Sequence, residues 1–273
     1  MPIPIDLVLV RHGESEANLA NTRSREFHDH SDFTKEYKAR HCSKMRLTEK
    51  GIKQARAAGA WIRDNIGDDF DGYHVSEFLR TIETAAQLGL ENANWRLDLL
   101  LRETDYGGTL DLLSGKERKK RFGGHLKRQK IDGIFWIPPT GGESIAQACL
   151  RVKAVLSALG NEWGETHLLV THGEMMRAFR ICLEHLSHFQ YAEIENSADP
   201  KDKIHSCQIL HYARRDPAKK EAPLEQDFSW VRSVCPWDPQ LSSNEWRKIE
   251  NPLYSNNELL ALAENYPRLV NHD

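Results

Sequence analysis

The stretch IDLVLVRHG, residues 5–13, decides the fold of this chain. Its first six residues are almost entirely apolar and three of them are β-branched, which is typical of a strand buried on both faces of a parallel sheet. The run ends at Arg11, His12 and Gly13. A strand of this kind delivers polar side chains at its carboxyl end, where open α/β sheets bind their ligands.

Strands and helices are expected to alternate along the rest of the chain. Short apolar runs predict strands at 72–75, 97–101, 167–171 and 206–212, and amphipathic spacing predicts helices at 48–65, 76–88, 144–159 and 174–186. This alternation predicts an α/β fold, a three-layer α/β/α sandwich with a mainly parallel central sheet.

Two segments depart from this pattern. Residues 21–46, after the first helix, are polar and without a clear period, and we expect an insertion or mobile loop there. We predict a catalytic domain over residues 1–215, in which 104–140 forms a cap segment, and a C-terminal extension, 216–273, docked on the same domain.

The composition is that of a soluble globular protein. The 37 Lys and Arg residues and 40 Asp and Glu residues give a net charge of −3, which predicts no global attraction to nucleic acid or to a membrane. The sequence contains no run of 18 apolar residues, so no transmembrane helix is predicted. The first residues are expected to form a strand rather than a signal peptide. The five cysteines lack CxxC spacing, which favours a reduced, cytoplasmic setting, and the sequence specifies no oligomeric state.

A second junction, LVTHGE at residues 169–174, repeats the first, because an apolar strand again ends in His-Gly-Glu before a helix. Two histidines delivered by separate strands, His12 and His172, can face one another at the sheet edge. Gly13 and Gly173 would let the backbone approach a ligand closely, and the helix after each offers free N–H groups to an anion.

Phosphate is the anion that these residues favour. Arg11 and Arg80, the latter in a helix that follows the strand at 72–75, offer two forked guanidinium groups that suit its geometry. At a pKa of about 6.5, roughly three-quarters of histidine side chains are neutral at pH 7, and neighbouring arginines lower that pKa further. His12 is therefore usable as a nucleophile.

A leaving alkoxide needs a proton, and Glu103 is the candidate general acid. It follows the predicted strand at 97–101, and its role requires a pKa raised by partial burial. Asp105, Glu14 and Glu143 are alternatives for this role.

Five motifs in this order and spacing resemble those of the histidine phosphatase superfamily, also called phosphoglycerate-mutase-like: RHGESEAN, SEFLRTIETA, LRETDYG, GES and THGE. The resemblance covers about residues 5–190 apart from 21–46. It implies that His12 is a phosphohistidine nucleophile and that Glu103 is the proton donor. It implies a phosphate pocket built from Arg11, Arg80 and His172, with Asn18 in contact with the phosphate, and it implies no metal or organic cofactor.

Two departures from the family pattern concern the substrate. Glu77 stands where the family often has proline, and the stretch that joins the first helix to the helix at 48–65 is much longer than usual. A phosphomonoester hydrolase acting on a small phosphorylated metabolite is the favoured function. The first alternative is a phosphoglycerate-mutase-type phosphotransferase, which the chain resembles around DYGG and PPTGGES, but mutases carry a much longer segment between these points. A non-catalytic module that binds phosphorylated ligands is less favoured.

Three further signals allow two interpretations each. The basic run 116–130 is either a solvated helix face or a cap that attracts a multiply charged substrate. His28, His30 and His41 fit no standard metal-ligand spacing and are interpreted as surface histidines. Tryptophans of the C-terminal extension are interpreted as docking anchors, with a stacking platform for a nucleobase as the alternative; they are Trp230, Trp237 and Trp246.

Overall fold

A seven-stranded sheet forms the centre of the protein. The computed structural model describes residues 3–107, 112–133, 135–136, 141–162, 164–219 and 221–270. The strands are β1 (Asp6–Arg11), β2 (Gly72–Val75), β3 (Trp95–Leu97), β4 (Thr166–Thr171), β5 (Ile209–Ala213), β6 (Trp230–Val234) and β7 (Trp246–Lys248). Their order across the sheet is β3-β2-β4-β1-β5-β6-β7.

The sheet is mixed. Strands β3, β2, β4 and β1 are parallel to one another, whereas β5, β6 and β7 each pair antiparallel with the preceding neighbour in the order. The predicted α/β class is confirmed. The parallel part of the sheet consists of β3, β2, β4 and β1. Strands β6 and β7 come from the C-terminal extension, so residues 230–248 widen the sheet.

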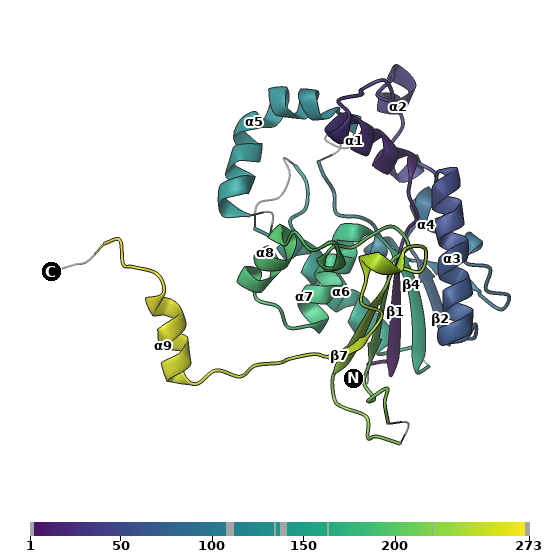
Figure 1. The fold of residues 1–273 in the computed structure, drawn as a ribbon, viewed down its shortest axis with the longest axis vertical. Coiled ribbons are helices and arrows are strands. Elements are labelled where there is room, and N and C mark those ends of the chain that lie inside the picture. Colours follow the sequence, from purple (N-terminus) through teal and green to yellow (C-terminus); the bar gives the residue numbers. More distant parts are fainter. Residues whose placement is uncertain are drawn as a thin grey trace.

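Helices cover both faces of the sheet (Figure 1). They are α1 (Glu16–Glu26), α2 (Lys35–Ala39), α3 (Glu49–Asn65), α4 (Leu79–Gln87), α5 (Gly115–Asp132), α6 (Ile145–Leu159), α7 (Gly173–Leu183), α8 (His188–Asn196) and α9 (Asn256–Glu264). Among the described residues, none of the helices combines the length and the apolar character needed to cross a bilayer.

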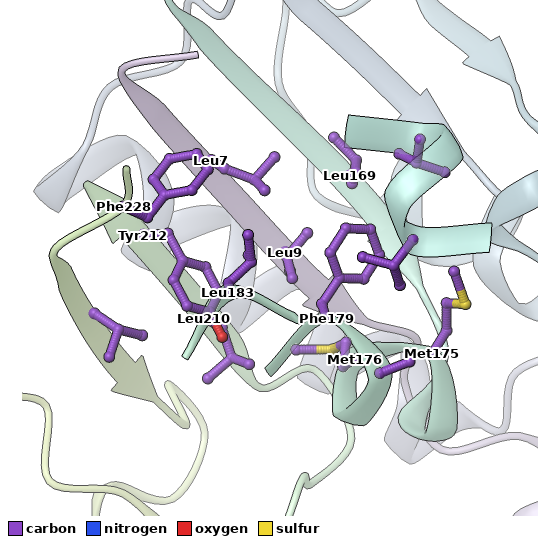
Figure 2. Packing of buried hydrophobic residues seen from close by; sticks show 14 of the residues in the cluster. Leu7, Leu9, Leu169, Met175, Met176, Phe179, Leu183, Leu210, Tyr212 and Phe228 are labelled. Carbon is purple, nitrogen blue, oxygen red and sulfur yellow. The ribbon is translucent and has the colours of Figure 1, made fainter. Parts of the chain in front are cut away.

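Side-chain alternation along β1 divides the core into two layers. Leu7 and Leu9 pack with Phe179 of α7 on one face, as Figure 2 shows, while Val8 and Val10 pack with Ile62 of α3 on the other. All four β1 side chains are fully buried. A strand buried on both faces accounts for the continuous apolar run that the sequence shows there.

Local structure differs from the sequence prediction at three places. Helix α1 continues to Glu26, so the segment predicted as a loop from residue 21 begins within a helix, and α2 interrupts the remainder. The strand predicted at 97–101 ends at Leu97, and a 3₁₀ turn follows over Leu99–Leu101. Helix α4 begins at Leu79 rather than at Ser76, because the Ser76 hydroxyl bonds to a histidine instead of capping the helix.

Helices α1, α2 and α5 lie together at the end of the sheet that is remote from the N-terminus (Figure 1). Three side-chain contacts join them: Arg118 of α5 donates to Asn21 of α1, the Gly115 N–H donates to Ser24 Oγ, and Lys38 of α2 pairs with Glu117 at 2.7 Å. These helices therefore form a roof over the carboxyl ends of the parallel strands.

The last part of the chain, after β7, does not join the sheet. All residues from 250 to 270 are exposed, and α9 extends away from the sheet (Figure 1). The stacking of Tyr266 on Phe189 of α8, with ring centroids 5.9 Å apart, ties this part to the domain.

A substitution at Gly59 tests the packing of α3 on α4. A Cβ at Gly59 would lie 1.8 Å from the carbonyl oxygen of Leu88, whereas a Cβ at Gly124 in α5 would meet no atom within 4 Å. We expect Gly59→Ala to lower the free energy of unfolding by about 1–3 kcal/mol or more, because backbone must move. Gly124→Ala is the matched control and should raise it by about 0.5–1 kcal/mol. Urea unfolding measures both, and equal effects would contradict this account of the packing.

Candidate active site

A cavity of about 540 Å³ opens at the carboxyl ends of β1 and β4, beneath the roof helices. Six of the seven residues predicted for the site line it: Arg11, His12, Asn18, Arg80, Glu103 and Gly173. They come from β1, α1, α4, the loop after the Leu99–Leu101 turn and the start of α7. The fold therefore brings together residues that are up to 162 positions apart in the sequence.

The hydrogen bonds of His12 fix its tautomer. Nδ1 lies 2.7 Å from the carbonyl oxygen of Gly13, which can only accept, so Nδ1 carries the proton. Arg80 Nε lies 3.1 Å from Nε2 and can only donate, so Nε2 carries a lone pair. The imidazole is 2% exposed and presents an unprotonated Nε2 towards the arginine that would hold a phosphate.

The surroundings of His12 keep it neutral. Burial lowers its pKa well below the usual value, and the positive charges of Arg80 and Arg11 lower it further. Neutrality is the condition for attack by an imidazole nitrogen. His12 thus has both the tautomer and the charge state of a nucleophile.

Backbone carbonyls orient the two arginines. Arg11 Nη1 donates to the Ile204 carbonyl at 2.6 Å, and Arg80 Nη1 donates to the Cys42 carbonyl at 2.9 Å. Arg80 also lies over the ring of Phe78, 4.8 Å from its centroid. Both guanidinium groups line the cavity beside His12, so they can bind one phosphate together.

His172 is placed beside His12 but behind the cavity wall. Its ring centroid lies 5.1 Å from that of His12, its side chain is fully buried, and it is not among the cavity-lining residues. Its Nε2 is 2.8 Å from the Ser76 hydroxyl. Burial, and then the charge of Arg80, lower its pKa well below the usual value. In this arrangement His172 packs against His12, with Ser76 holding its ring.

Glu103 has the properties that a general acid requires. Burial, and then the negative charge of Glu174, raise its pKa to about 7, against the opposing influence of Arg80 and Arg11. Near neutral pH its carboxyl is thus protonated in about half of the molecules. The carboxyl also accepts a hydrogen bond from the N–H of Thr104 at 3.0 Å, which orients it.

The alternative acids are engaged elsewhere. Glu143 forms a two-bond pair with Arg151, at 2.7 and 2.6 Å, outside the cavity. Asp105 is exposed and accepts from the Gly107 N–H. Glu14 lines the cavity, but its two oxygens are bound by Thr48 and Lys50. The geometry therefore favours Glu103.

Asn18 and Gly173 take up specific local roles. Asn18 Oδ1 accepts from the Ser15 N–H at 3.1 Å and closes a capping box at the start of α1. Gly173 begins α7, whose first N–H groups lack carbonyl partners within the helix. A Cβ at Gly173 would lie 3.3 Å from Arg11 Nε, so glycine leaves space for that guanidinium.

Several lining residues were not predicted for the site. The roof contributes cations from α1 and α5, Arg25 and Arg118, and α7 contributes the Glu174–Arg177 ion pair. The basic run 116–130 was the sequence signal for Arg118. Trp237 also lines the cavity, with its Nε1 donating to the Ser206 carbonyl at 2.6 Å. No sequence pattern separated Trp237 from the other tryptophans of the extension.

The remaining sequence signals lie away from the cavity. His30 Nδ1 contacts Ser24 Oγ at 3.0 Å and His41 Nδ1 contacts Ser43 Oγ at 2.8 Å, so these two histidines have local hydroxyl partners. The Arg232 guanidinium lies over the ring of Trp246, 4.9 Å from its centroid, and over that of Trp61 of α3, 4.7 Å from its centroid. Within the described residues, the group of side chains close enough to share a metal ion is His74, Glu162 and His167, and none of these lines the cavity.

The fold and the paired histidines define a class of phosphoryl-transfer enzymes. The model of the histidine phosphatase superfamily (branch 1) matches residues 7–218, and the chain belongs to this family. The family acts on small phosphorylated substrates, and this chain is an enzyme of the phosphatase or mutase kind.

Curated relatives and solved structures point to both kinds of enzyme. The chain is 33% identical over 193 residues to a 2,3-bisphosphoglycerate-dependent phosphoglycerate mutase of Azorhizobium caulinodans, covering 66% of this chain and 82% of that protein. An alpha-ribazole phosphatase from Shigella flexneri shares the fold with a TM-score of 0.59 at 16% identity, over 81% of this chain and 96% of its own. A mycobacterial glucosyl-3-phosphoglycerate phosphatase does so with a TM-score of 0.57 at 21% identity, over 84% and 96%.

Removal of Arg80 tests the electrostatic control of His12. We expect Arg80→Gln to raise the pKa of His12, because a positive charge that opposes imidazolium formation is lost. The measurement is NMR titration of the imidazole signals, with His12→Ala used to assign the His12 resonance. In the unaltered protein His12 should stay neutral well below pH 6.5, and an unchanged midpoint in the variant would contradict the role of Arg80.

Proposed function

We propose that this protein is a phosphomonoester hydrolase that works through a phosphohistidine intermediate at His12. The observation that carries the proposal is the pairing of an unprotonated His12 Nε2 with a Glu103 carboxyl whose pKa is about 7, both on one cavity. One group can attack phosphorus, and the other can protonate the leaving oxygen.

In the first step, the Nε2 lone pair of His12 forms a bond to phosphorus. The bond from phosphorus to the ester oxygen breaks, and that oxygen keeps the electron pair and takes the proton of Glu103. Phosphate oxygens compete for the N–H groups of Arg11 and Arg80, which frees Nε2 from its bond to Arg80. The guanidinium charges stabilise the equatorial oxygens of the transferring group.

In the second step, water attacks the phosphorus of phosphohistidine. Glu103, now a carboxylate, takes the proton of that water. The N–P bond breaks, its electron pair returns to Nε2, and inorganic phosphate leaves. A pKa of about 7 suits Glu103 for both roles, because neither form of the carboxyl is strongly disfavoured at neutral pH.

The cavity suits a small, anionic metabolite. Its volume is about 540 Å³, which accommodates a small molecule rather than a protein segment. Its cations outnumber its acids, since Arg11, Arg25, Arg80, Arg118, Arg177 and Lys50 line it together with Glu14, Glu103 and Glu174. A cytoplasmic setting, inferred from the cysteine pattern, fits such a substrate.

A mutase is the second candidate, and the likeness to the curated mutase of Azorhizobium caulinodans supports it. A mutase returns the phosphoryl group to a hydroxyl of a substrate and must keep water from the intermediate. The segment between DYGG and PPTGGES is short in this chain, which leaves less protein to cover the phosphohistidine. Parts of that segment, including 108–111 and 137–140, lie outside the described residues. This shortness supports release of the phosphate to water.

Substitution of Glu103 tests its role as the acid. Glu103→Gln should lower kcat/KM for an alkyl phosphate by about 10²–10⁴-fold, and lower it far less for p-nitrophenyl phosphate, whose leaving group needs no proton. With the alkyl substrate, kcat/KM should fall above about pH 7 as Glu103 loses its proton, and this decline should vanish in the variant. Asp105→Asn is the matched control and should keep the profile; equal losses on both substrates would exclude general acid catalysis by Glu103.

A transfer-versus-release assay tests the proposed function itself. The enzyme is incubated separately with 3-phosphoglycerate and with an aryl phosphate, and inorganic phosphate and isomerised product are measured. We expect free phosphate and an acid-labile, alkali-stable adduct that His12→Ala abolishes. Isomerisation without free phosphate would establish the mutase instead. Absence of the adduct and of both products would support a module that only binds phosphorylated ligands.

A further inference from the structure

A second group of buried histidines lies on β2 and β4, outside the cavity described above. His74 on β2 and His167 on β4 face Glu162, which precedes β4, and one ligand atom from each residue lies within 4.8 Å of the others. The imidazole centroids are 5.6 Å apart. Glu162 precedes β4, His167 is the second residue of β4 and His74 is the third of the four residues of β2, and none of the three lines the cavity that His12 lines. The group is therefore separate from the catalytic cavity.

The histidine nitrogens of this group lack partners. His167 is fully buried, and neither of its ring nitrogens has a hydrogen-bond partner among the residues that the structure describes. Nε2 of His74, a residue that is 4% exposed, is likewise without one. A buried polar atom without a partner is unfavourable, and a native structure with several at one place calls for a bound group.

Gly72 leaves space beside these nitrogens. It pairs directly with His167 across the two strands, and it lies two residues before His74, on the same face of the sheet. A Cβ at this position would lie 2.3 Å from His167 Nδ1 and 3.0 Å from His74 Nε2. Any side chain larger than hydrogen would fill the space next to the two imidazoles, so glycine keeps it open.

The carboxylate is already oriented towards the histidines. Arg96 of β3 pairs with Oε1 of Glu162, and Oε2 lies 3.4 Å from His74 Nε2. Two ligands of a tetrahedral ion with bonds of about 2.0–2.1 Å are separated by about 3.4 Å, so this pair has the required spacing. The arginine acts on the carboxylate as an outer partner that holds its orientation.

We propose that His74, Glu162 and His167 bind a divalent transition-metal ion of the Zn²⁺ class, which joins β2, β4 and the segment that precedes β4. Two imidazoles and one carboxylate are the ligand types that Zn²⁺ favours over Mg²⁺ or Ca²⁺. The ligands must be neutral imidazoles, and burial lowers the pKa of both histidines, which favours that form. Glu162 is 26% exposed, which provides a path of entry and room for a water ligand.

This ion would stabilise the fold and take no part in phosphoryl transfer. It lies away from His12 and Glu103, so its removal should lower stability without altering the chemistry. The alternative is a simple ion pair in which His74 is protonated and bonded to Glu162. That pair would leave both nitrogens of His167 without a partner, whereas a metal ion would bind one atom of each of the three residues.

Metal titration of the whole, chelator-stripped protein tests the proposal. Co²⁺ should bind with one equivalent per chain and give the visible absorption of a tetrahedral site with nitrogen ligands. Zn²⁺ at about 100 times its Kd should raise the Tm by roughly 5–10 °C. His167→Gln should abolish both signals while the far-UV circular dichroism stays that of a folded protein, and Gly72→Ala should weaken the binding at least tenfold without removing any ligand.

Two control variants locate the metal. His211 is also a buried strand histidine beside a carboxylate, 2.8 Å from Asp6, but it is not part of the group, so His211→Gln should keep the Co²⁺ spectrum. His12→Ala should also keep it, which separates this site from the catalytic histidines. The proposal is overturned if Zn²⁺ leaves the Tm unchanged, if the signals persist in His167→Gln, or if His12→Ala removes them.

Discussion

The hydrogen bond from His12 Nδ1 to the Gly13 carbonyl determines which nitrogen of this imidazole can attack phosphorus. It depends on the exact path of the backbone after β1, and two helices fix that path. The Gly13 N–H donates to Thr84 Oγ1 of α4, and a Cβ at Gly13 would lie 2.5 Å from the Gly51 carbonyl of α3. The close packing of α3 and α4 on the sheet is thus a condition for the correct tautomer of the nucleophile.

Charge in the cavity acts on its two key groups in opposite directions. Burial together with Arg80 and Arg11 lowers the pKa of His12, whereas burial together with Glu174 raises the pKa of Glu103. Burial is the largest cause in both cases, and it favours the neutral form of each group. Acid and nucleophile are therefore ready at the same pH, and the arginines can be placed next to both without forcing Glu103 to ionise. This balance explains how one cavity can bind a dianion and still donate a proton.

Sequence reasoning located the residues that follow strands and missed those placed by tertiary contacts. Arg11, His12 and His172 were predictable because strand ends converge at one edge of a parallel sheet. Ser76 was predicted to begin the helix at 76–88, and only the three-dimensional position of His172 shows that the Ser76 hydroxyl bonds to this histidine instead. Trp237 reaches the cavity from a segment without periodicity. His74, Glu162 and His167 are spread over 93 positions of the sequence, and no motif links them.

Strand β4 has a buried histidine near its start, His167, and another directly after its last residue, His172, and their neighbours give them different chemistry. Arg11 and Arg80 lie near His172, and both lower its pKa. Their charges repel a cation, so the carboxyl end of the sheet is suited to phosphate. Near His167 the Arg96 guanidinium is paired with Glu162, whose second oxygen remains directed at the imidazoles. The charged side chains around each end therefore separate an anion site from a cation site along a single strand, and this separation allows a structural metal to bind without competing for the catalytic histidines.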